Sequence, residues 1–417
     1  MKRIQSFLYI IYFLPVFFTI RILTGFLALI GFNKLVRFSH NLFDINHRVL
    51  YLAAFFPENA GYHYRVHKWV EILNHNGFEA STRYVFEKEQ FDELMSQKRT
   101  VFFQTVFLLH RIWHCIYALT YNCVIVRREL LLYNDYGNLF LEKLLLALHP
   151  NVVLDFDDDI SVAKREPREI TLVGRLMFES PAKFQESLKL YSRFIVGSNY
   201  LRNLVSENKS EISDKDIVVI ATCVDYKKYP IKVYDWKSEY VNFGWLGSNH
   251  NIYLLKIIIP VLNEISKNHK IRFLVISGQD YGPENANFEI VNISWSLEKE
   301  LENLHKIDIG LMPLYDTAVE RGKCGFKLIQ YMGAGIVSIA GAITINKEII
   351  DDKQNGFLVH RESDWLSVIE EVLARREDFP TIGAEARKKI CNKFSFEANK
   401  KKYLNFIETA VNKLCVA

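Results

Sequence analysis

The chain has 417 residues, of which 49% are hydrophobic and 14% aromatic; this composition excludes a disordered protein and allows two domains with separate cores. Its 52 basic and 48 acidic residues leave a formal net charge of +4, which gives no indication of a nucleic-acid partner. The six cysteines are scattered without C-x-x-C spacing, which favours free thiols in a reducing compartment over disulfides or a metal cluster.

The chain opens with an apolar stretch, residues 7–32, with basic residues on both sides of it. Four interpretations apply: a signal peptide, a spanning helix, a helix or hairpin that enters one leaflet, and a buried helix of a soluble core. No small-x-small cleavage site follows, and the flanking charges place both ends on one side of a membrane. Because Pro15 lies near its middle, we expect residues 1–47 to be a hydrophobic membrane-anchoring segment that is monotopic or re-entrant.

Short apolar runs then alternate with helical patterns, which is typical of a parallel α/β sheet. In the first half we expect strands within residues 48–55, 123–129, 152–159, 194–198 and 217–225, and helices over 62–73, 139–148 and the end of 189–208. Pro230 and mixed charges mark a linker at residues 226–240.

Two places in this half carry candidate ligand contacts. The loop at residues 57–65 follows the first strand, at the sheet edge where parallel sheets bind ligands, although an ordinary surface loop is the alternative. An acidic cluster ends a later strand and consists of Asp155, Asp157, Asp158 and Asp159. It is a candidate metal site, with acceptor contacts and a solvated strand end as the alternatives.

The second half begins with a strand from Val241 that runs into a Gly247-Ser248 turn. Gly247 lets the backbone approach a ligand, and Ser248 is placed to cap the following helix and direct donors at a phosphate. Further strands are expected at residues 271–277, 289–293, 336–340 and 355–359, and helices at 252–268, 297–305, 365–376, 384–394 and 396–411.

The most informative stretch is residues 308–335, which reads as a strand, a polar loop and a helix that opens at Gly325 and Phe326. Arg321, Lys323 and Lys327 bring three cations to the helix start, where unpaired N–H groups already favour an anion. This is a candidate diphosphate site. One turn later, the Gln330 side chain can hydrogen-bond a ribose. A buried strand and helix with a solvated basic loop is the alternative interpretation.

This stretch resembles the donor-binding segment of the family 4 glycosyltransferases, in the subgroup that reads D-I-G-L-x-P-L, then R-G-K-x-x-F-K-L, then a tyrosine and a methionine. The family usually carries two glutamates eight positions apart, where this chain has Gly322 and Gln330. The resemblance spans residues 48–410 and is specific in the second half only.

The resemblance implies a retaining enzyme of the GT-B architecture, an α/β fold of two Rossmann-like parallel-sheet lobes. We therefore expect an N-terminal acceptor lobe at residues 48–235, a nucleotide-sugar donor lobe at 236–395, and a C-terminal helix at 396–417 that crosses back to the first lobe. It also implies site residues. Lys327, Lys323 and Arg321 would be catalytic; Gly247, Ser248, Gly325, Phe326 and Gln330 would bind the donor; Gly61, His63, Arg65, Asp157 and Asp158 would face the acceptor or the cleft.

The predicted activity is transfer of a hexose-type sugar from a nucleotide diphosphate sugar to a saccharide or lipid-linked acceptor, at the cytoplasmic face of the cell membrane. No metal or other cofactor is expected, because the three cations can neutralise the diphosphate. The alternatives are a non-catalytic relative that binds nucleotide sugars as a membrane scaffold, and an epimerase or phosphorylase on the same frame.

Overall fold

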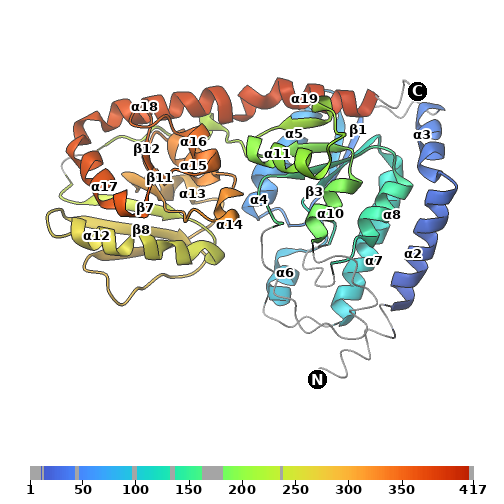
Figure 1. The fold of residues 1–417 in the computed structure, drawn as a ribbon, viewed down its shortest axis with the longest axis horizontal. Coiled ribbons are helices and arrows are strands. Elements are labelled where there is room, and N and C mark those ends of the chain that lie inside the picture. The colour runs from blue at the N-terminus through green and yellow to red at the C-terminus, as the bar shows by residue number, and fades with distance from the viewer. Residues whose placement is uncertain are drawn as a thin grey trace. The chain divides into compact units, whose positions relative to one another are not determined.

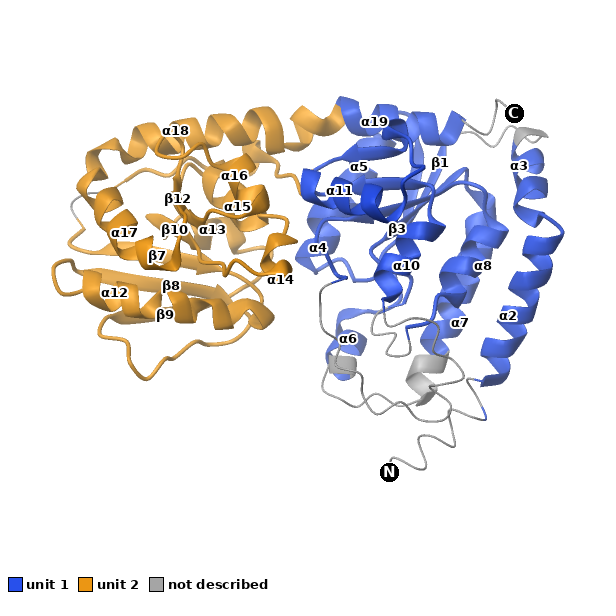
Figure 2. Cartoon of the chain, viewed as in Figure 1, with its two compact units in different colours: residues 1–220, 401–417 blue, residues 221–400 orange. Residues whose placement is uncertain are grey.

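The computed structural model describes residues 11, 14–42, 47–95, 101–131, 137–161, 182–234 and 238–412 (Figure 1). The chain forms two compact units: unit 1 comprises residues 1–220 and 401–417, and unit 2 comprises residues 221–400 (Figure 2). The predicted boundary between residues 235 and 236 therefore lies inside unit 2. The physical reason is the pairing of Val224, whose N–H donates to the carbonyl of Phe394 at 3.1 Å and which forms a β-bridge with Ser395.

Unit 1 contains a six-stranded parallel sheet in the order β2-β1-β3-β4-β5-β6. Its strands are β1 (Arg48–Leu52), β2 (Glu79–Arg83), β3 (Cys123–Arg127), β4 (Val152–Phe156), β5 (Arg193–Val196) and β6 (Ile217–Val219). The sequence analysis missed β2, since this edge strand has the polar sequence EASTR and lacks an apolar run.

The helices of unit 1 cover this sheet (Figure 1). They are α4 (Ala60–Tyr62), a π-helical turn (His63–His67), α5 (Lys68–Asn74), α6 (Lys88–Met95), α7 (Val101–Tyr117), α8 (Phe140–Leu148), α10 (Lys183–Leu190) and α11 (Asn199–Asn208). The single helix expected over residues 62–73 is thus interrupted by a π turn that contains Arg65.

The N-terminal helices α2 (Leu14–Leu29) and α3 (Phe32–Leu42) belong to the core of unit 1. Phe17, Ile20 and Leu27 are buried, and the Phe17 ring meets Phe140 of α8 edge to face at 5.3 Å between centroids. Within the expected segment 1–47, helix α2 therefore packs against α8 of the first lobe through apolar side chains.

No single helix among the described residues has the length and hydropathy needed to cross a membrane. Leu14–Leu29 and Phe32–His40 reach that length and hydropathy only when taken together, and the two helices are bent by 65°.

Unit 2 contains a second six-stranded parallel sheet, in the order β12-β11-β10-β7-β8-β9. Its strands are β7 (Val241–Leu246), β8 (Ile271–Ser277), β9 (Glu289–Ser294), β10 (Ile309–Met312), β11 (Val337–Gly341) and β12 (Phe357–Val359). Alternate residues enter two separate apolar clusters, with Phe243 and Trp245 in one and Leu246 in the other, so both faces of the sheet are buried.

The helical segments of unit 2 include a 3₁₀ segment (Asn249–Ile257), α12 (Ile259–Ile265), α13 (Glu300–Leu304), α14 (Ala318–Arg321), α15 (Phe326–Gly333), α16 (Thr344–Ile349), α17 (Trp365–Ala374) and α18 (Phe379–Lys389). Two predicted starts are wrong: the helix expected at 252–268 begins as α12 at Ile259, and the one expected at 384–394 begins at Phe379. In both cases a proline, Pro260 or Pro380, occupies the first turn, where its missing N–H costs nothing.

The last helix, α19 (Phe396–Asn412), begins in unit 2, and its residues from Lys401 onward belong to unit 1. There the Tyr403 ring stacks on Trp69 of α5 at 4.0 Å, and the Asn151 side chain donates to the carbonyl of Ala410 at 2.5 Å.

Candidate functional site

The strand order of unit 2 reverses between β7 and β10, which are neighbours in the sheet although β8 and β9 lie between them in sequence. At such a switch point the loops that leave the carboxyl ends of the two strands diverge, and ligands of open parallel sheets bind there. These two loops are residues 247–248 and 313–325, the same segments that the sequence analysis selected.

Lys327 lies against the turn that follows β7. A Cβ atom added at Gly247 would come within 2.9 Å of Lys327 Cε and 2.3 Å of the Trp245 ring, so only glycine fits at this position. The Lys327 ammonium lies 5.4 Å from the centre of the Trp245 ring, a cation–π geometry. A positive charge is therefore packed onto the backbone of the Gly247 turn.

Lys323 is tied to the same turn through Asn251. Its ammonium donates to Asn251 Oδ1 at 2.8 Å, and Asn251 Nδ2 donates to Ser248 Oγ at 3.0 Å. Ser248 precedes the 3₁₀ segment, but its hydroxyl makes no capping bond to the backbone. The expected cap is absent, because the hydroxyl accepts from the Asn251 amide instead.

Gly325 provides the entry into α15. It has φ +68°, and an added Cβ would meet Ile349 Cδ1 at 2.6 Å, so both the backbone angle and the space require glycine. Phe326 begins α15 and packs partly into the apolar cluster beneath it. The first N–H groups of this helix lack helical partners and give its start a partial positive charge.

Arg321, predicted as catalytic, and Gln330, predicted to bind the donor, both contact acidic partners. Arg321 is half exposed and forms an ion pair with Asp316 at 2.6 Å. Gln330 is only 2% exposed, and its amide nitrogen donates to Glu300 Oε1 at 2.7 Å. The other oxygen of Glu300 accepts from the Trp295 indole at 2.8 Å, so Gln330 forms part of a buried polar network.

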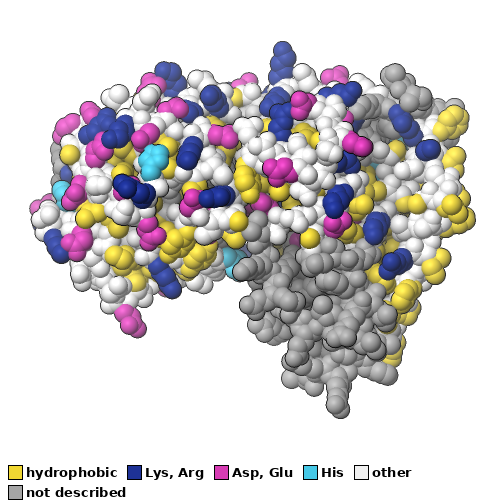
Figure 3. All heavy atoms as spheres, viewed as in Figure 1, with side chains coloured by type: hydrophobic (Ala, Val, Ile, Leu, Met, Phe, Trp, Pro, Cys, Tyr) yellow, Lys and Arg dark blue, Asp and Glu magenta, His cyan; other side chains and the backbone are white. Residues whose placement is uncertain are grey.

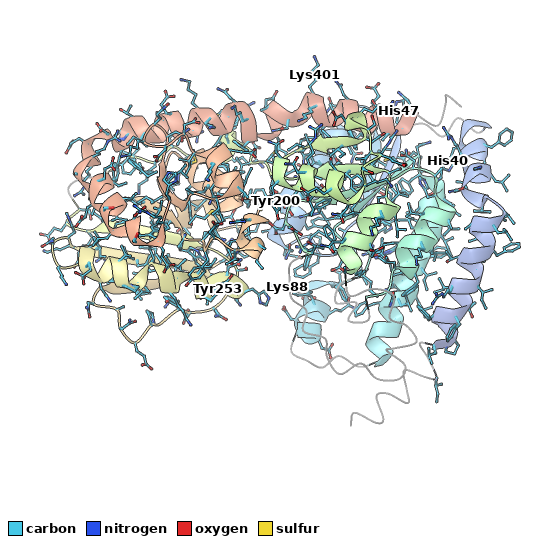
Figure 4. The ribbon with its side chains drawn as sticks, in the orientation of Figure 1. His40, His47, Lys88, Tyr200, Tyr253 and Lys401 are labelled. Carbon is cyan, nitrogen blue, oxygen red and sulfur yellow. The ribbon has the colours of Figure 1, made fainter. Side chains whose placement is uncertain are left out.

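A residue that the sequence analysis missed is Glu320, whose side chain is buried in the loop after β10. Its carboxylate accepts hydrogen bonds from the hydroxyls of Thr317 and Tyr253, and the Lys323 backbone N–H donates to its carbonyl at 3.1 Å. Burial opposes ionisation, but these hydroxyls and the nearby Lys323 charge lower the pKa of Glu320. Tyr253 lies in the 3₁₀ segment that follows the Gly247-Ser248 turn (Figure 4), so Glu320 links the loop after β10 to this segment.

In unit 1, Arg65 lies in a buried charge cluster at the carboxyl ends of β3 and β4. Its guanidinium donates to both oxygens of Asp155, the shortest contact being 2.7 Å, and also to the carbonyl of Ile220. Arg127 completes the cluster with a hydrogen bond to Asp157. Burial opposes ionisation of Asp157, but Arg127 and Arg65 outweigh it and hold its pKa well below the usual range.

The remaining predicted residues of unit 1 lie around this cluster. Gly61 is in α4, where its N–H donates to the Asn59 side chain at 2.9 Å. His63 is half-buried at the start of the π turn, with its ring 4.9 Å from that of Tyr64. Asp158 is half-buried, and Asp159 accepts from the Ser161 backbone at 2.9 Å and from Tyr200 at 3.3 Å (Figure 4).

No group of three or more histidine, cysteine or acidic side chains is arranged to hold a metal within the part of the chain that the structure describes. The structure thus gathers Gly247, Ser248, Lys323, Gly325 and Lys327 in unit 2. Two ammonium groups and a helix start next to a glycine turn form an arrangement suited to an anion with several oxygens.

Residues 241–375 match the family model described as "Glycosyl transferases group 1". This range contains both loops of the switch point. Unit 2 therefore contains a region similar to a glycosyltransferase domain, which supports a transferase. No match was found among curated proteins.

Several solved structures share the fold over nearly the whole chain. A glycosyltransferase from Rickettsia africae aligns with a TM-score of 0.59 and 13% identity, over 89% of this chain and 99% of that one. HepE from Anabaena, solved with UDP and glucose, gives 0.58 and 12%, over 87% and 100%. Sucrose-phosphate synthase from Thermosynechococcus elongatus gives 0.60 and 14%, over 87% and 98%. At these identities the likeness shows the fold: two parallel-sheet α/β lobes of the GT-B type.

Proposed function

We propose that the protein is a retaining glycosyltransferase that moves a hexose-type sugar from a nucleoside diphosphate sugar to a saccharide or lipid-linked acceptor. The observation that supports this most directly is the position of Lys327. Its side chain lies on the Gly247 turn at the sheet's switch point, next to the start of α15. The structure of HepE with UDP and glucose adds support for a nucleotide-sugar donor on this fold.

The chemistry follows from where charge develops. As the bond between the sugar and the phosphate breaks, negative charge builds on the leaving diphosphate and positive charge on the sugar. Lys327, Lys323 and the N–H groups of α15 would stabilise the leaving group more strongly in the transition state than in the ground state. Arg321 would add charge only by leaving Asp316, so we give it a secondary role. A separate metal or cofactor is not part of the proposal.

For the donor's ribose we propose an indirect role of Gln330. Its side-chain amide already donates to Glu300. Gln330 would therefore orient that buried carboxylate and the start of α15, and would not contact the ribose directly. In unit 1, we propose that a buried charge cluster supports the loops that bind the acceptor; it consists of Arg65, Asp155, Arg127 and Asp157. The side chains proposed to contact the acceptor are His63 and Asp158.

The acceptor and the compartment belong to the proposal as well. Reaction at the cytoplasmic face of the cell membrane, in the synthesis of a surface polysaccharide or glycolipid, fits a nucleotide-sugar donor. A lipopolysaccharide outer core galactosyltransferase shares the fold, with a TM-score of 0.56 and 11% identity over 87% of this chain and 99% of that one.

A second candidate function rests on one observation. Gly322 and Gln330 occupy the positions of the family's two glutamates, and Gln330 is bound to Glu300, which favours a nucleotide-sugar-binding scaffold without turnover. Incubation of the purified protein with a panel of nucleotide sugars separates the two. Slow release of nucleoside diphosphate supports the transferase, whereas saturable binding without any release supports the scaffold.

A further inference from the structure

The outer side of α2 and α3 is an unusually apolar surface. More than half of the exposed large hydrophobic side chains among the described residues lie between Ile11 and Phe38. The most open of them are Leu29 (85% exposed), Ile22 (74%) and Phe38 (67%), and Phe26 and Leu35 are more than half exposed. Figure 3 shows hydrophobic side chains gathered along the edge formed by these two helices. We call this surface the α2–α3 face.

The inner side of the same helices is fixed to unit 1. Phe17, Ile20 and Leu27 are buried against α8, and the Asn33 side chain donates to the carbonyl of Leu146 at 3.1 Å. On α3, the His40 ring bonds the carbonyl of Leu119 at 2.7 Å (Figure 4). Because one side of α2 and α3 packs on unit 1, only the opposite side can contact another surface. This arrangement suits helices that lie along a surface.

The bend between the two helices lies at Gly31. Gly31, with φ +62°, turns the chain by bonding its N–H to the carbonyl of Ala28 at 3.1 Å. The Gly31 carbonyl accepts from the Lys34 backbone N–H at 2.9 Å, and this hydrogen bond starts α3. The resulting 65° bend is incompatible with a straight spanning helix.

The residues around the α2–α3 face carry only positive charge. The first 43 residues contain no aspartate or glutamate, whereas Arg21 and Lys34 are exposed and Arg37 is half-buried. Apolar side chains with only basic residues among them match the interface of a membrane that contains anionic lipids.

We propose that the α2–α3 face is an in-plane docking surface for an anionic lipid bilayer, in which α2 and α3 lie along the interface and do not span it. This attachment does not depend on the proposed transferase chemistry. Lipid contact would also account for an apolar surface of this extent on a folded unit.

The test uses the full chain and a triple variant, Ile22→Ser, Phe26→Ser and Leu29→Ser, which removes exposed apolar groups but leaves Phe17, Ile20 and Leu27 in place. A matched control, Ile231→Ser with Val233→Ser, removes side chains that are 62% and 83% exposed in unit 2. Binding is measured by co-sedimentation with vesicles of phosphatidylcholine alone or mixed with phosphatidylglycerol, and folding by the melting temperature.

We expect the wild-type protein and the control to bind the mixed vesicles. The triple variant should bind them at least about tenfold more weakly. Reversal of charge with Lys34→Glu should weaken binding to the mixed vesicles more than to phosphatidylcholine alone. If the triple variant does not fold, the single variant Leu29→Ser replaces it and should show a smaller loss in the same direction. Equal vesicle binding by the wild type and a folded variant overturns the proposal. It is also overturned if neither protein binds vesicles and the wild type forms a dimer that the substitutions dissociate.

Discussion

At the scale of single residues, the charged and polar side chains of the candidate sites differ in whether the sequence could predict their surroundings. Lys323 and Lys327 were predicted from the local sequence together with the family resemblance, because a cation at a helix start can be recognised in the local sequence. The burial of Arg65 and Gln330 was not predictable in this way. Arg65 pairs with Asp155 and Gln330 with Glu300, and these contacts join positions far apart in the sequence. Glu320 gave no signal, since its partner Tyr253 lies on another segment.

The Glu320 bridge leads to a prediction about donor binding. Tyr253→Phe removes the hydroxyl that joins the 3₁₀ segment after β7 to Glu320 in the loop after β10, and a hydrogen bond to a carboxylate is worth about 1.5–3 kcal/mol. We expect UDP to bind about tenfold more weakly, with a smaller change in kcat, measured by titration calorimetry and steady-state kinetics. The control is Tyr281→Phe, which keeps a tyrosine-sized ring elsewhere in unit 2. Unchanged nucleotide affinity in Tyr253→Phe would show that the bridge does not position the site.

His149 leads to a prediction about pH. It is buried, accepts from the Asn151 N–H at 3.1 Å and bonds the carbonyl of Tyr121; burial lowers its pKa to about 4 from 6.5. His149 therefore becomes protonated below about pH 6.5 in the unfolded chain, but only below about pH 4 in the folded protein. The free energy of unfolding should fall over this interval by about 3 kcal/mol from this group. His149→Gln should flatten the slope, and exposed His250→Gln should keep it; equal slopes in both variants would exclude His149 as the source.

At the scale of elements, the periodic apolar runs predicted most strands of both sheets, since a strand buried on both faces needs a continuous apolar sequence. β8 was predicted to the residue, at 271–277. The errors have local physical causes: β2 is polar, Pro260 and Pro380 start helices, and the π turn at His63–His67 leaves no mark in the hydrophobic pattern.

The start of α15 provides a test at this scale. Gly325→Ala places a Cβ 2.6 Å from Ile349 Cδ1 in a left-handed conformation. We expect a loss of stability of about 1–3 kcal/mol together with weaker nucleotide binding, because the helix start would shift. Gly77→Ala is the matched control: its φ is +86°, but nothing lies within 4 Å of the added atom. If both variants melt alike and bind nucleotide alike, the packing at Gly325 has no special role.

At the scale of the whole molecule, two lobes were predictable from length and from the alternation of strands and helices. Their division was not, because Val224 pairs with Ser395 only in the folded chain. Likewise, the apolar N-terminal stretch predicted membrane contact, but it could not indicate that one side of α2 is used to pack on α8.

Metal independence is a prediction for the whole enzyme. Lys323 and Lys327 supply fixed positive charge to the diphosphate, so turnover with a nucleotide sugar should persist in the presence of a chelator. The assay compares initial rates with and without EDTA, and then with added magnesium or manganese. A loss of rate that either ion restores would assign the diphosphate-neutralising role to a cation, with Asp155, Asp157, Asp158 and Asp159 as the first residues to examine.

The proposed transfer depends on the Lys327 ammonium, which would stabilise the leaving diphosphate, and Lys327→Ala removes this group. The exposed Lys388, which pairs with Glu385 on its own helix, provides a control with the same change of charge. With the donor that the panel identifies, we measure kcat, UDP affinity and melting temperature for both variants. We expect Lys327→Ala to lower kcat by roughly 10²-fold or more and to weaken UDP binding, while Lys388→Ala resembles the wild type and both proteins remain folded. A Lys327→Ala protein that turns over and binds UDP as well as the wild type would contradict it.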